Sequence, residues 1–198
     1  MNPLHKNPVI KQPKNEHYPT PKSLSRRLLS LGEFDCTRHV HEPAEGFGAI
    51  TGVLREFWPE KLISSADIVT GTDFLTDLNY YPQIITNPPF SLVDDFVRRA
   101  RVCCDKFAFI VPLNALSSES RWKRGTWRGL RKVWVFNRQV NYSFPLQEDG
   151  RFFTSGITTG WFVWERGPDK DFFETRIMDV SEDVVKISQK DACHQESG

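Results

Sequence analysis

Long apolar runs are missing from this sequence. No run approaches the ~20 apolar residues that a membrane span requires. The first fifteen residues, MNPLHKNPVIKQPKN, also lack the apolar core of a secretory signal. We therefore expect no membrane association and a cytoplasmic location. Internal repeats and low-complexity blocks are absent as well, and 198 residues suit a single domain that can bury a sizeable core.

Cysteine is scarce, with four in 198 residues, and none of them has the spacing of metal ligands. The adjacent pair Cys103 and Cys104 would point to different faces of either a strand or a helix. We interpret the cysteines as buried or idle thiols in a reducing compartment and expect no metal site.

Excess charge of one sign is also missing, because the net charge is only +1. The distribution of charge is more informative. Residues 121–132 (RWKRGTWRGLRK) contain six cations and no acid, whereas residues 168–198 contain eight acids and four bases. The basic segment is compatible with a polyanion partner, or with a solvated helix that carries a tryptophan seam. Its candidate nucleic-acid contacts are Arg121, Trp122, Lys123, Arg124, Trp127 and Arg128.

Strand-like and helical patterns alternate along most of the chain. Strands are expected at 39–43, 61–69, 81–87 and 106–113, with helices at 22–31, 49–57 and 91–104. Two aromatic, β-branched stretches at 131–144 and 158–167 predict late antiparallel strands. This order predicts an α/β fold with a mostly parallel, doubly wound sheet and a late antiparallel hairpin. We expect a mobile arm at 1–17, a catalytic domain at 18–167 and an acidic extension at 168–198.

A glycine-containing turn, HEPAEGFGAITG at 41–52, follows the first expected strand. Gly46 and Gly48 allow a tight turn and the close approach of a ligand to backbone N–H groups. Glu42 and Glu45 would repel a pyrophosphate but suit an ammonium group or ribose hydroxyls. The spacing of the glycines also misses the dinucleotide fingerprint by one residue. Together these features favour a nucleoside without phosphates, such as S-adenosyl-L-methionine, over a nicotinamide cofactor.

Acids stand at the next strand ends. Asp67 follows Gly48 by nineteen positions, where an acid commonly binds ribose hydroxyls, and Asp73 with Phe74 offers an acceptor and a ring for an adenine. Each of these residues could equally be a helix cap, a turn former or a core phenylalanine, and only their order along the chain favours a ligand site.

The stretch IITNPPF at 84–90 ends the third expected strand. Two prolines cannot continue a central strand, so they stop it stiffly. The side-chain carbonyl of Asn87 and the backbone carbonyl of Pro88 can accept both N–H bonds of a planar amine, while Pro89 stiffens the path and Phe90 offers a flat ring. This arrangement predicts a clamp for a flat, amine-bearing substrate; a rigid turn is the alternative.

The stretches YPTP, EPAEGFG, ADI, TDF, NPPF and GWFVWERG, taken together, resemble the ordered motifs of S-adenosyl-L-methionine-dependent amino-methyltransferases. They are most similar to small, phage-type DNA adenine-N6 methyltransferases. The resemblance covers residues 18–167. NPPF after an EPxxGxG turn is a fairly specific pair, although NPP[FY] also occurs in RNA and protein-glutamine N-methyltransferases.

The resemblance implies a role for each matching position. Asn87, Pro88, Pro89 and Phe90 would hold the target base, which must leave its stack if the substrate is duplex DNA. The cofactor-binding set would be Tyr18, Thr20, Glu42, Ala44, Gly46, Gly48, Asp67, Asp73, Phe74 and Asn87.

The resemblance also leaves alternatives open. No separate target-recognition domain is visible, so specificity would come from residues 114–130, from the 145–157 loop, or from a partner such as a specificity subunit or a second copy. Double-stranded DNA is the expected substrate. An RNA amine, a protein glutamine, or a binding module that has lost turnover are the competing hypotheses.

Overall fold

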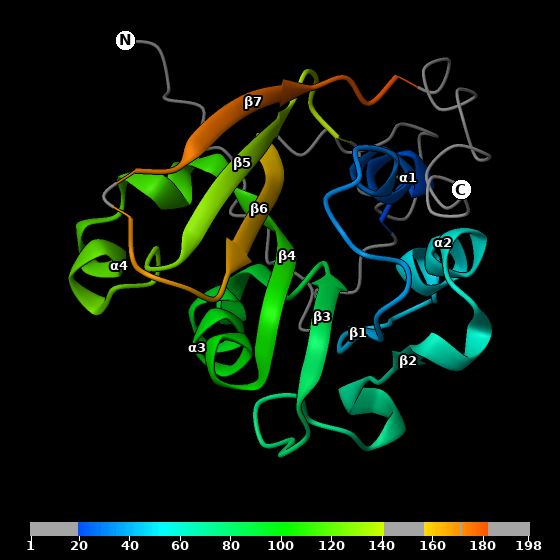
Figure 1. Ribbon diagram of the computed structural model, residues 1–198. Helices are drawn as coiled ribbons and strands as arrows, with labels where there is room; N and C mark the ends of the chain where they lie inside the picture. Colours follow the sequence, from blue (N-terminus) through cyan, green and yellow to red (C-terminus); the bar gives the residue numbers. More distant parts are fainter. Residues whose placement is uncertain (1–19, 141–156, 171, 182–198) are drawn as a thin grey trace, which may run out of the picture.

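A computed structural model describes residues 20–140, 157–170 and 172–181 of the chain. These residues form one seven-stranded mixed sheet with helices on both faces (Figure 1). The predicted α/β fold with a late antiparallel pair of strands is confirmed. The expected N-terminal arm at 1–17, the loop at 145–156 and most of the acidic extension lie outside the described residues.

The strands of the sheet are β1 (Val40–Glu42), β2 (Ile63–Ser65), β3 (Tyr81–Thr86), β4 (Cys104–Pro112), β5 (Leu130–Phe136), β6 (Thr159–Glu165) and β7 (Glu174–Met178). The α-helices are α1 (Lys22–Ser30), α2 (Ala49–Phe57), α3 (Val93–Cys103) and α4 (Glu119–Arg124). Short 3₁₀ turns connect them, namely η1 (Glu60–Leu62), η2 (Ile68–Thr70), η3 (Phe90–Leu92) and η4 (Leu113–Ser117).

The strand order is β2-β1-β3-β4-β6-β5-β7. The first four strands are parallel, and β6 runs antiparallel to both of its neighbours, β4 and β5. The chain leaves β1 toward β2 on one side and returns to β3 on the other. The order therefore reverses between β1 and β3, where ligands bind in open α/β sheets.

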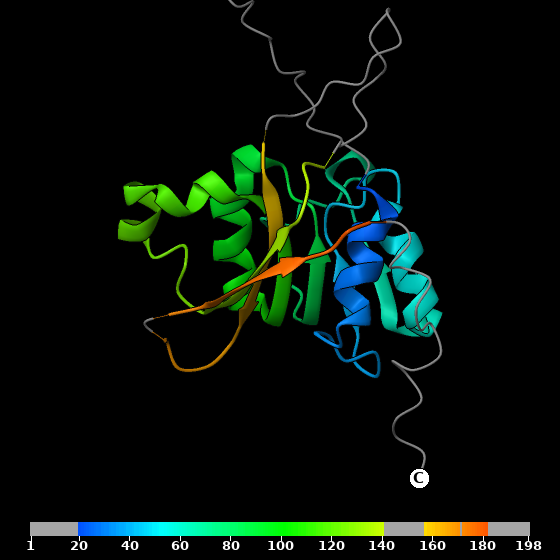
Figure 2. The ribbon, with the colours of Figure 1, turned by 90° about the horizontal axis from the view of Figure 1, so that it is seen from above.

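The two faces of the sheet are covered by different helices. Figure 2 shows α1 and α2 on one side and α3 on the other. Helix α2 buries Ile50, Val53 and Leu54 against the first face, at the i, i+3, i+4 spacing of an amphipathic helix. Helix α3 buries a matching stripe against the second face. Strand β4 is buried over most of its length because it is covered from both sides, as its continuous apolar sequence predicts.

Several elements differ from the sequence prediction. The strand expected at 131–144 ends at Phe136, and residues 137–140 are not in a strand. The strand expected at 61–69 is confined to β2, because the Asp67 side chain accepts the Val69 N–H at 2.8 Å and starts the 3₁₀ turn η2. Strand β7 was not expected. It pairs in parallel with β5, so the sheet continues past residue 167 into the segment interpreted as an extension.

Within the described ranges, no helix is both long enough and apolar enough to cross a membrane. The same ranges contain no group of three or more His, Cys, Asp or Glu side chains arranged to hold a metal ion.

Candidate active site

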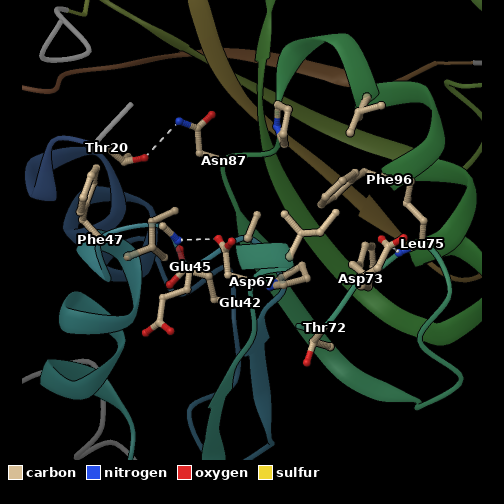
Figure 3. Close-up of a pocket in the computed structure, with 18 of the residues that line it drawn as sticks. Thr20, Glu42, Glu45, Phe47, Asp67, Thr72, Asp73, Leu75, Asn87 and Phe96 are labelled. Carbon is tan, nitrogen blue, oxygen red and sulfur yellow. Dashed lines mark hydrogen bonds between the residues drawn. The ribbon is translucent and has the colours of Figure 1, made fainter. Parts of the chain in front are cut away.

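A cavity of about 290 Å³ opens at the carboxyl ends of β1, β2 and β3 (Figure 3). Its described lining includes nine of the residues singled out in the sequence, namely Thr20, Glu42, Ala44, Gly46, Asp67, Asp73, Phe74, Asn87 and Pro89. Glu45, the second acid of the glycine turn, lines it as well. Residues from five separate parts of the chain therefore meet where the strand order reverses. Tyr18 lies outside the described residues.

The glycine turn forms the wall of the cavity beyond β1. Gly46 and Gly48 have φ values of 53° and 71°, a left-handed conformation that a side chain at Cβ disfavours. Gly48 caps the start of α2 and donates its N–H to the Glu45 carbonyl at 2.9 Å, although it is not among the described lining residues. The turn thus places its backbone beside the cavity, as the glycine spacing predicts.

Asp67 joins this turn to the end of β2. Its carboxylate accepts the N–H of Gly46 at 2.9 Å and the N–H of Val69 at 2.8 Å, and the residue is only 6% exposed. Each carboxylate oxygen has a second lone pair, so these bonds leave acceptor capacity for a ligand. The sequence predicted the position of Asp67 on the cavity wall but did not predict that it holds two loops.

Glu42 is the last residue of β1 and is 1% exposed. Burial raises the pKa of its carboxyl group to about 8, and the hydrogen bond from the Thr51 hydroxyl only partly opposes this rise. The group is therefore mostly protonated near neutral pH in the free protein. A cation placed beside it would favour the ionised form.

This raised pKa predicts a pH dependence of stability. The unfolded carboxyl group loses its proton near pH 4.5, whereas the folded one holds it to about pH 8. Folding is therefore favoured most below pH 4.5, and that stabilisation decreases as the pH rises to 8. Glu42→Gln cannot ionise at this position. We therefore expect the Tm of Glu42→Gln minus the Tm of wild type to increase by roughly 5 °C or more from pH 5 to pH 8.

The measurement is the difference in Tm between the two proteins across this range. A difference is needed because His41, whose pKa is lowered to about 4 by burial, titrates with the opposite sign between pH 4 and 6.5. A constant difference from pH 5 to 8 would show that Glu42 titrates normally.

Asn87 follows β3 directly and lies between the glycine turn and α3. Its side-chain N–H donates to the Thr20 hydroxyl oxygen at 3.1 Å, as Figure 3 shows. Its side-chain carbonyl oxygen is buried and has no hydrogen-bond partner among the described residues. Eight buried side-chain polar atoms of the described residues lack a hydrogen-bond partner, and among the residues that carry them Asn87 alone lines the cavity. The free acceptor predicted for Asn87 is therefore present at the edge of the cavity.

The other residues of the NPPF stretch differ in whether they line the cavity. Pro89 lines the cavity, whereas Pro88 and Phe90 are not among its described lining residues. Phe90 begins η3 and is partly buried against core residues on both faces of the sheet. Its ring therefore packs against the core in this structure, and the role of Phe90 as a stacking platform stays a prediction.

The far end of the cavity is apolar. Phe74 is 3% exposed and packs against Phe96 with ring centroids 5.1 Å apart, while Asp73 accepts the N–H of Leu75 at 2.9 Å. Both predicted residues line the cavity, together with the exposed side chain of Ile68.

Sequence reasoning missed several apolar lining residues. Phe47 and Ile68 are 80% and 68% exposed at the cavity, and Leu75, Leu92 and Phe96 also line it. One signal was available, because Phe47 and Ile68 adjoin the predicted site residues Gly46 and Asp67 in the sequence. The others belong to helical or turn patterns that look like ordinary core.

The charges in the cavity are of one sign. Its described lining contains four carboxyl groups, Glu42, Glu45, Asp67 and Asp73, and no lysine or arginine. Such a site favours a ligand with positive charge and hydroxyl groups, and it disfavours a phosphate, which typically needs cations or a helix N-terminus free of acids.

The basic segment lies on and after α4, and its members have different surroundings. Arg121 and Arg124 both pair with Asp94 of α3, at 3.1 and 3.0 Å. Trp122 is 56% exposed. Trp127, by contrast, is 5% exposed and stacks on Trp164, so the prediction that it is available to stack on a base is wrong. The alternative of a solvated helix with a tryptophan seam is also wrong, because α4 ends at Arg124 and Trp127 lies beyond it.

Comparisons with known proteins give matches at the level of structure only. No family model matches the sequence, and no curated protein sequence matches it. Among solved structures, the type IIG restriction endonuclease BpuSI is 14% identical with a TM-score of 0.60, over 80% of this chain and 26% of BpuSI. The chain has the class I methyltransferase fold.

Two further structures share this methyltransferase fold. PH1948 of Pyrococcus horikoshii, a proposed RNA methyltransferase, has a TM-score of 0.59 and 15% identity over 80% of this chain and 91% of its own. The M protein of the type I restriction enzyme EcoKI has a TM-score of 0.55 and 14% identity, over 81% of this chain and 47% of its own. The chain thus spans nearly all of PH1948 but less than half of the two restriction-enzyme proteins.

Proposed function

We propose that the protein transfers a methyl group from S-adenosyl-L-methionine to the exocyclic N6 amine of adenine in DNA. The observation that carries the proposal is the buried carbonyl oxygen of Asn87, which lacks a hydrogen-bond partner in the described part of the chain and lies at the edge of an acidic cavity. The methyltransferase fold and the order of motifs, with NPPF directly after β3, support it.

The cavity suits the chemistry of this cofactor. S-adenosyl-L-methionine carries a sulfonium and an ammonium group and no phosphate, and the described lining offers four carboxyl groups and no cation. We assign the amino-acid portion to Glu42 and the glycine turn and the ribose to Asp67. The adenine lies at Asp73 and Phe74, where the walls are apolar. Bound there, the cofactor supplies an electrophilic methyl group.

Asn87 and Pro88 carry the chemistry on the substrate side. The exocyclic amine of adenine is a weak nucleophile because its lone pair is delocalised into the ring. Two carbonyl acceptors that take its N–H bonds stabilise the positive charge that grows on nitrogen as it attacks. The stiff Pro88-Pro89 path keeps these acceptors in place, and such positioning contributes much of the rate of a direct displacement.

The DNA-facing surface is assigned to the exposed part of the basic segment. Trp122 and Lys123 are exposed on α4, which follows the carboxyl end of β4 through η4. Arg128 is exposed as well, but it precedes β5, which runs parallel to β4, and it therefore lies at the opposite end of the sheet from the cavity. We expect Lys123→Ala and Trp122→Ala each to weaken binding to duplex DNA by roughly three- to tenfold, and Lys123→Ala to reduce its salt dependence.

The matched control for this surface is Trp127→Phe. The buried indole contributes to packing, so this change should lower the free energy of unfolding by about 1–3 kcal/mol and leave DNA affinity unchanged. DNA affinity measured by fluorescence anisotropy at two salt concentrations separates the variants. Wild-type affinity in both surface variants would place the DNA contact elsewhere on the molecule.

A second candidate function keeps the chemistry and changes the acceptor to an RNA amine or a protein glutamine. The similarity to PH1948, which extends over 91% of that chain, favours RNA as the alternative. Tritiated methyl transfer to DNA, RNA and protein fractions in parallel distinguishes them. We expect incorporation into DNA; incorporation into RNA or protein alone would contradict the proposed substrate.

The proposed function also requires a part of the molecule that reads the target sequence. Residues 114–130, including η4 and α4, are the described candidates for reading the target sequence, and a specificity subunit or a second copy of the chain could add to them. Absence of calorimetric binding of S-adenosyl-L-methionine to folded protein would favour a binding module without turnover.

A further inference from the structure

Thr20 contacts the residue at the centre of the proposed chemistry. Its hydroxyl oxygen accepts the side-chain N–H of Asn87 at 3.1 Å, across 67 positions of sequence. Thr20 is 6% exposed, so water does not compete freely for this hydrogen bond. Figure 3 shows the two side chains pointing toward each other from opposite sides of the cavity edge.

Thr20 is held in place by the core. It precedes Pro21, which caps α1, and α1 buries Leu24 and Leu28 in the core on its face of the sheet. The indole N–H of Trp161, a fully buried residue of β6, donates to the Leu24 carbonyl at 3.0 Å. The position of the hydroxyl group therefore depends on the packing of α1 and does not require a bound cofactor.

In this structure the contact occupies the N–H end of the Asn87 amide and leaves its carbonyl end free of partners from the described part of the chain. One amide N–H is bound to Thr20, and the carbonyl oxygen is left buried without a partner in the described residues. Without the Thr20 acceptor, the amide could rotate and present its N–H₂ group to an incoming amine. Two donors would then face each other, and the stabilisation of charge on the substrate nitrogen would be lost.

We propose that Thr20 is a positioning residue that acts through Asn87, and that it affects methyl transfer more than cofactor affinity. The proposal rests on the proposed function for its kinetic consequence. It differs from the role that the resemblance implies for Thr20, which is closure over the cofactor.

Two substitutions in the full chain test it. Thr20→Val removes the hydroxyl group at nearly constant volume, and Thr20→Ser retains it. We expect Thr20→Val to lower kcat for methyl transfer to DNA by roughly ten- to a hundredfold. The Kd for S-adenosyl-L-methionine, measured by calorimetry, should stay within about threefold of wild type in both variants, and Thr20→Ser should retain kcat within about threefold.

A spectroscopic measurement tests the contact apart from activity. The side-chain amide signals of Asn87, assigned by their loss in Asn87→Ala, should show slowed hydrogen exchange in wild type and Thr20→Ser but fast exchange in Thr20→Val. Fast exchange in wild type would overturn the contact. The exchange rate of the Asn87 amide does not depend on which molecule accepts the methyl group. A protein that does not methylate DNA but shows slowed exchange would contradict the proposed function and leave the Thr20–Asn87 contact intact.

The values of kcat for the two Thr20 variants also test the inference. A Thr20→Val protein that keeps wild-type kcat would overturn the inference, as would a Thr20→Ser protein impaired as strongly as Thr20→Val. A weaker cofactor Kd with unchanged kcat would assign Thr20 to the cofactor instead.

Discussion

Asn87→Ala is expected to remove methyl transfer while leaving S-adenosyl-L-methionine affinity within about threefold of wild type. The substitution deletes the buried carbonyl oxygen, which has no hydrogen-bond partner among the residues that the structure describes. In the proposed mechanism this acceptor is needed only when positive charge develops on the substrate nitrogen. Loss of one such electrostatic contact costs roughly 100- to 1,000-fold in kcat. The loss should fall on kcat, because the contact strengthens in the transition state.

Single-turnover transfer of a tritiated methyl group measures the rate, and calorimetry measures the cofactor affinity. Asn79→Ala is the matched control, because this exposed asparagine precedes β3 at the end away from the cavity. Its side-chain N–H donates to Asp77 of its own loop, and its backbone carbonyl, which the substitution keeps, accepts from Arg99. Activity within a few fold of wild type in Asn87→Ala would show that the role assigned to Asn87 is wrong.

Asp67→Ala has the second-largest expected effect. The substitution should lower both the free energy of unfolding and the affinity for the cofactor. The Asp67 carboxylate is buried and accepts two backbone N–H groups. In Asp67→Ala neither N–H group has this acceptor. Hydrogen bonds to charged groups contribute about 1.5–3 kcal/mol each, so loss of two should lower the free energy of unfolding by roughly 3–6 kcal/mol. Cofactor affinity should fall at least roughly 100-fold, because both the ribose acceptor and the position of the glycine turn are lost.

Urea unfolding and calorimetry give the two quantities. Asp35→Ala is a matched control, since Asp35 also accepts a backbone N–H, from Thr37 at 2.8 Å, but lies outside the cavity. It should lose about 1 kcal/mol of stability and no cofactor affinity. If Asp67→Ala bound the cofactor within fivefold of wild type, the ribose site would have to lie elsewhere.

The order of elements could be predicted because it depends on local patterns. The alternation of apolar stretches places β1, β3 and β4, and the glycine turn and NPPF mark where strands end. In a parallel sheet, strand ends that bear Glu42, Asp67 and Asn87 must lie on the same edge. The cavity therefore follows from the sequence once the strands are recognised.

What could not be predicted depends on contacts between distant residues. Trp127 is surrounded by cations in the sequence, yet the stacked rings of Phe162 and Trp164 bury it. Strand β7 has mostly exposed side chains and joins the sheet through backbone bonds to β5, which side-chain patterns do not reveal. Similarly, nothing near Asn87 in the sequence indicates the hydroxyl group of Thr20. The sequence predicts which residues carry out the chemistry, and the tertiary structure shows how those side chains are held.

The most direct test of the account is mass spectrometry of DNA from cells that lack adenine methylation and express this protein. We expect N6-methyladenine in the DNA of cells with the wild-type chain and none in cells with Asn87→Ala at equal expression. No N6-methyladenine from wild type, with folded and cofactor-binding protein present in the same cells, would contradict it.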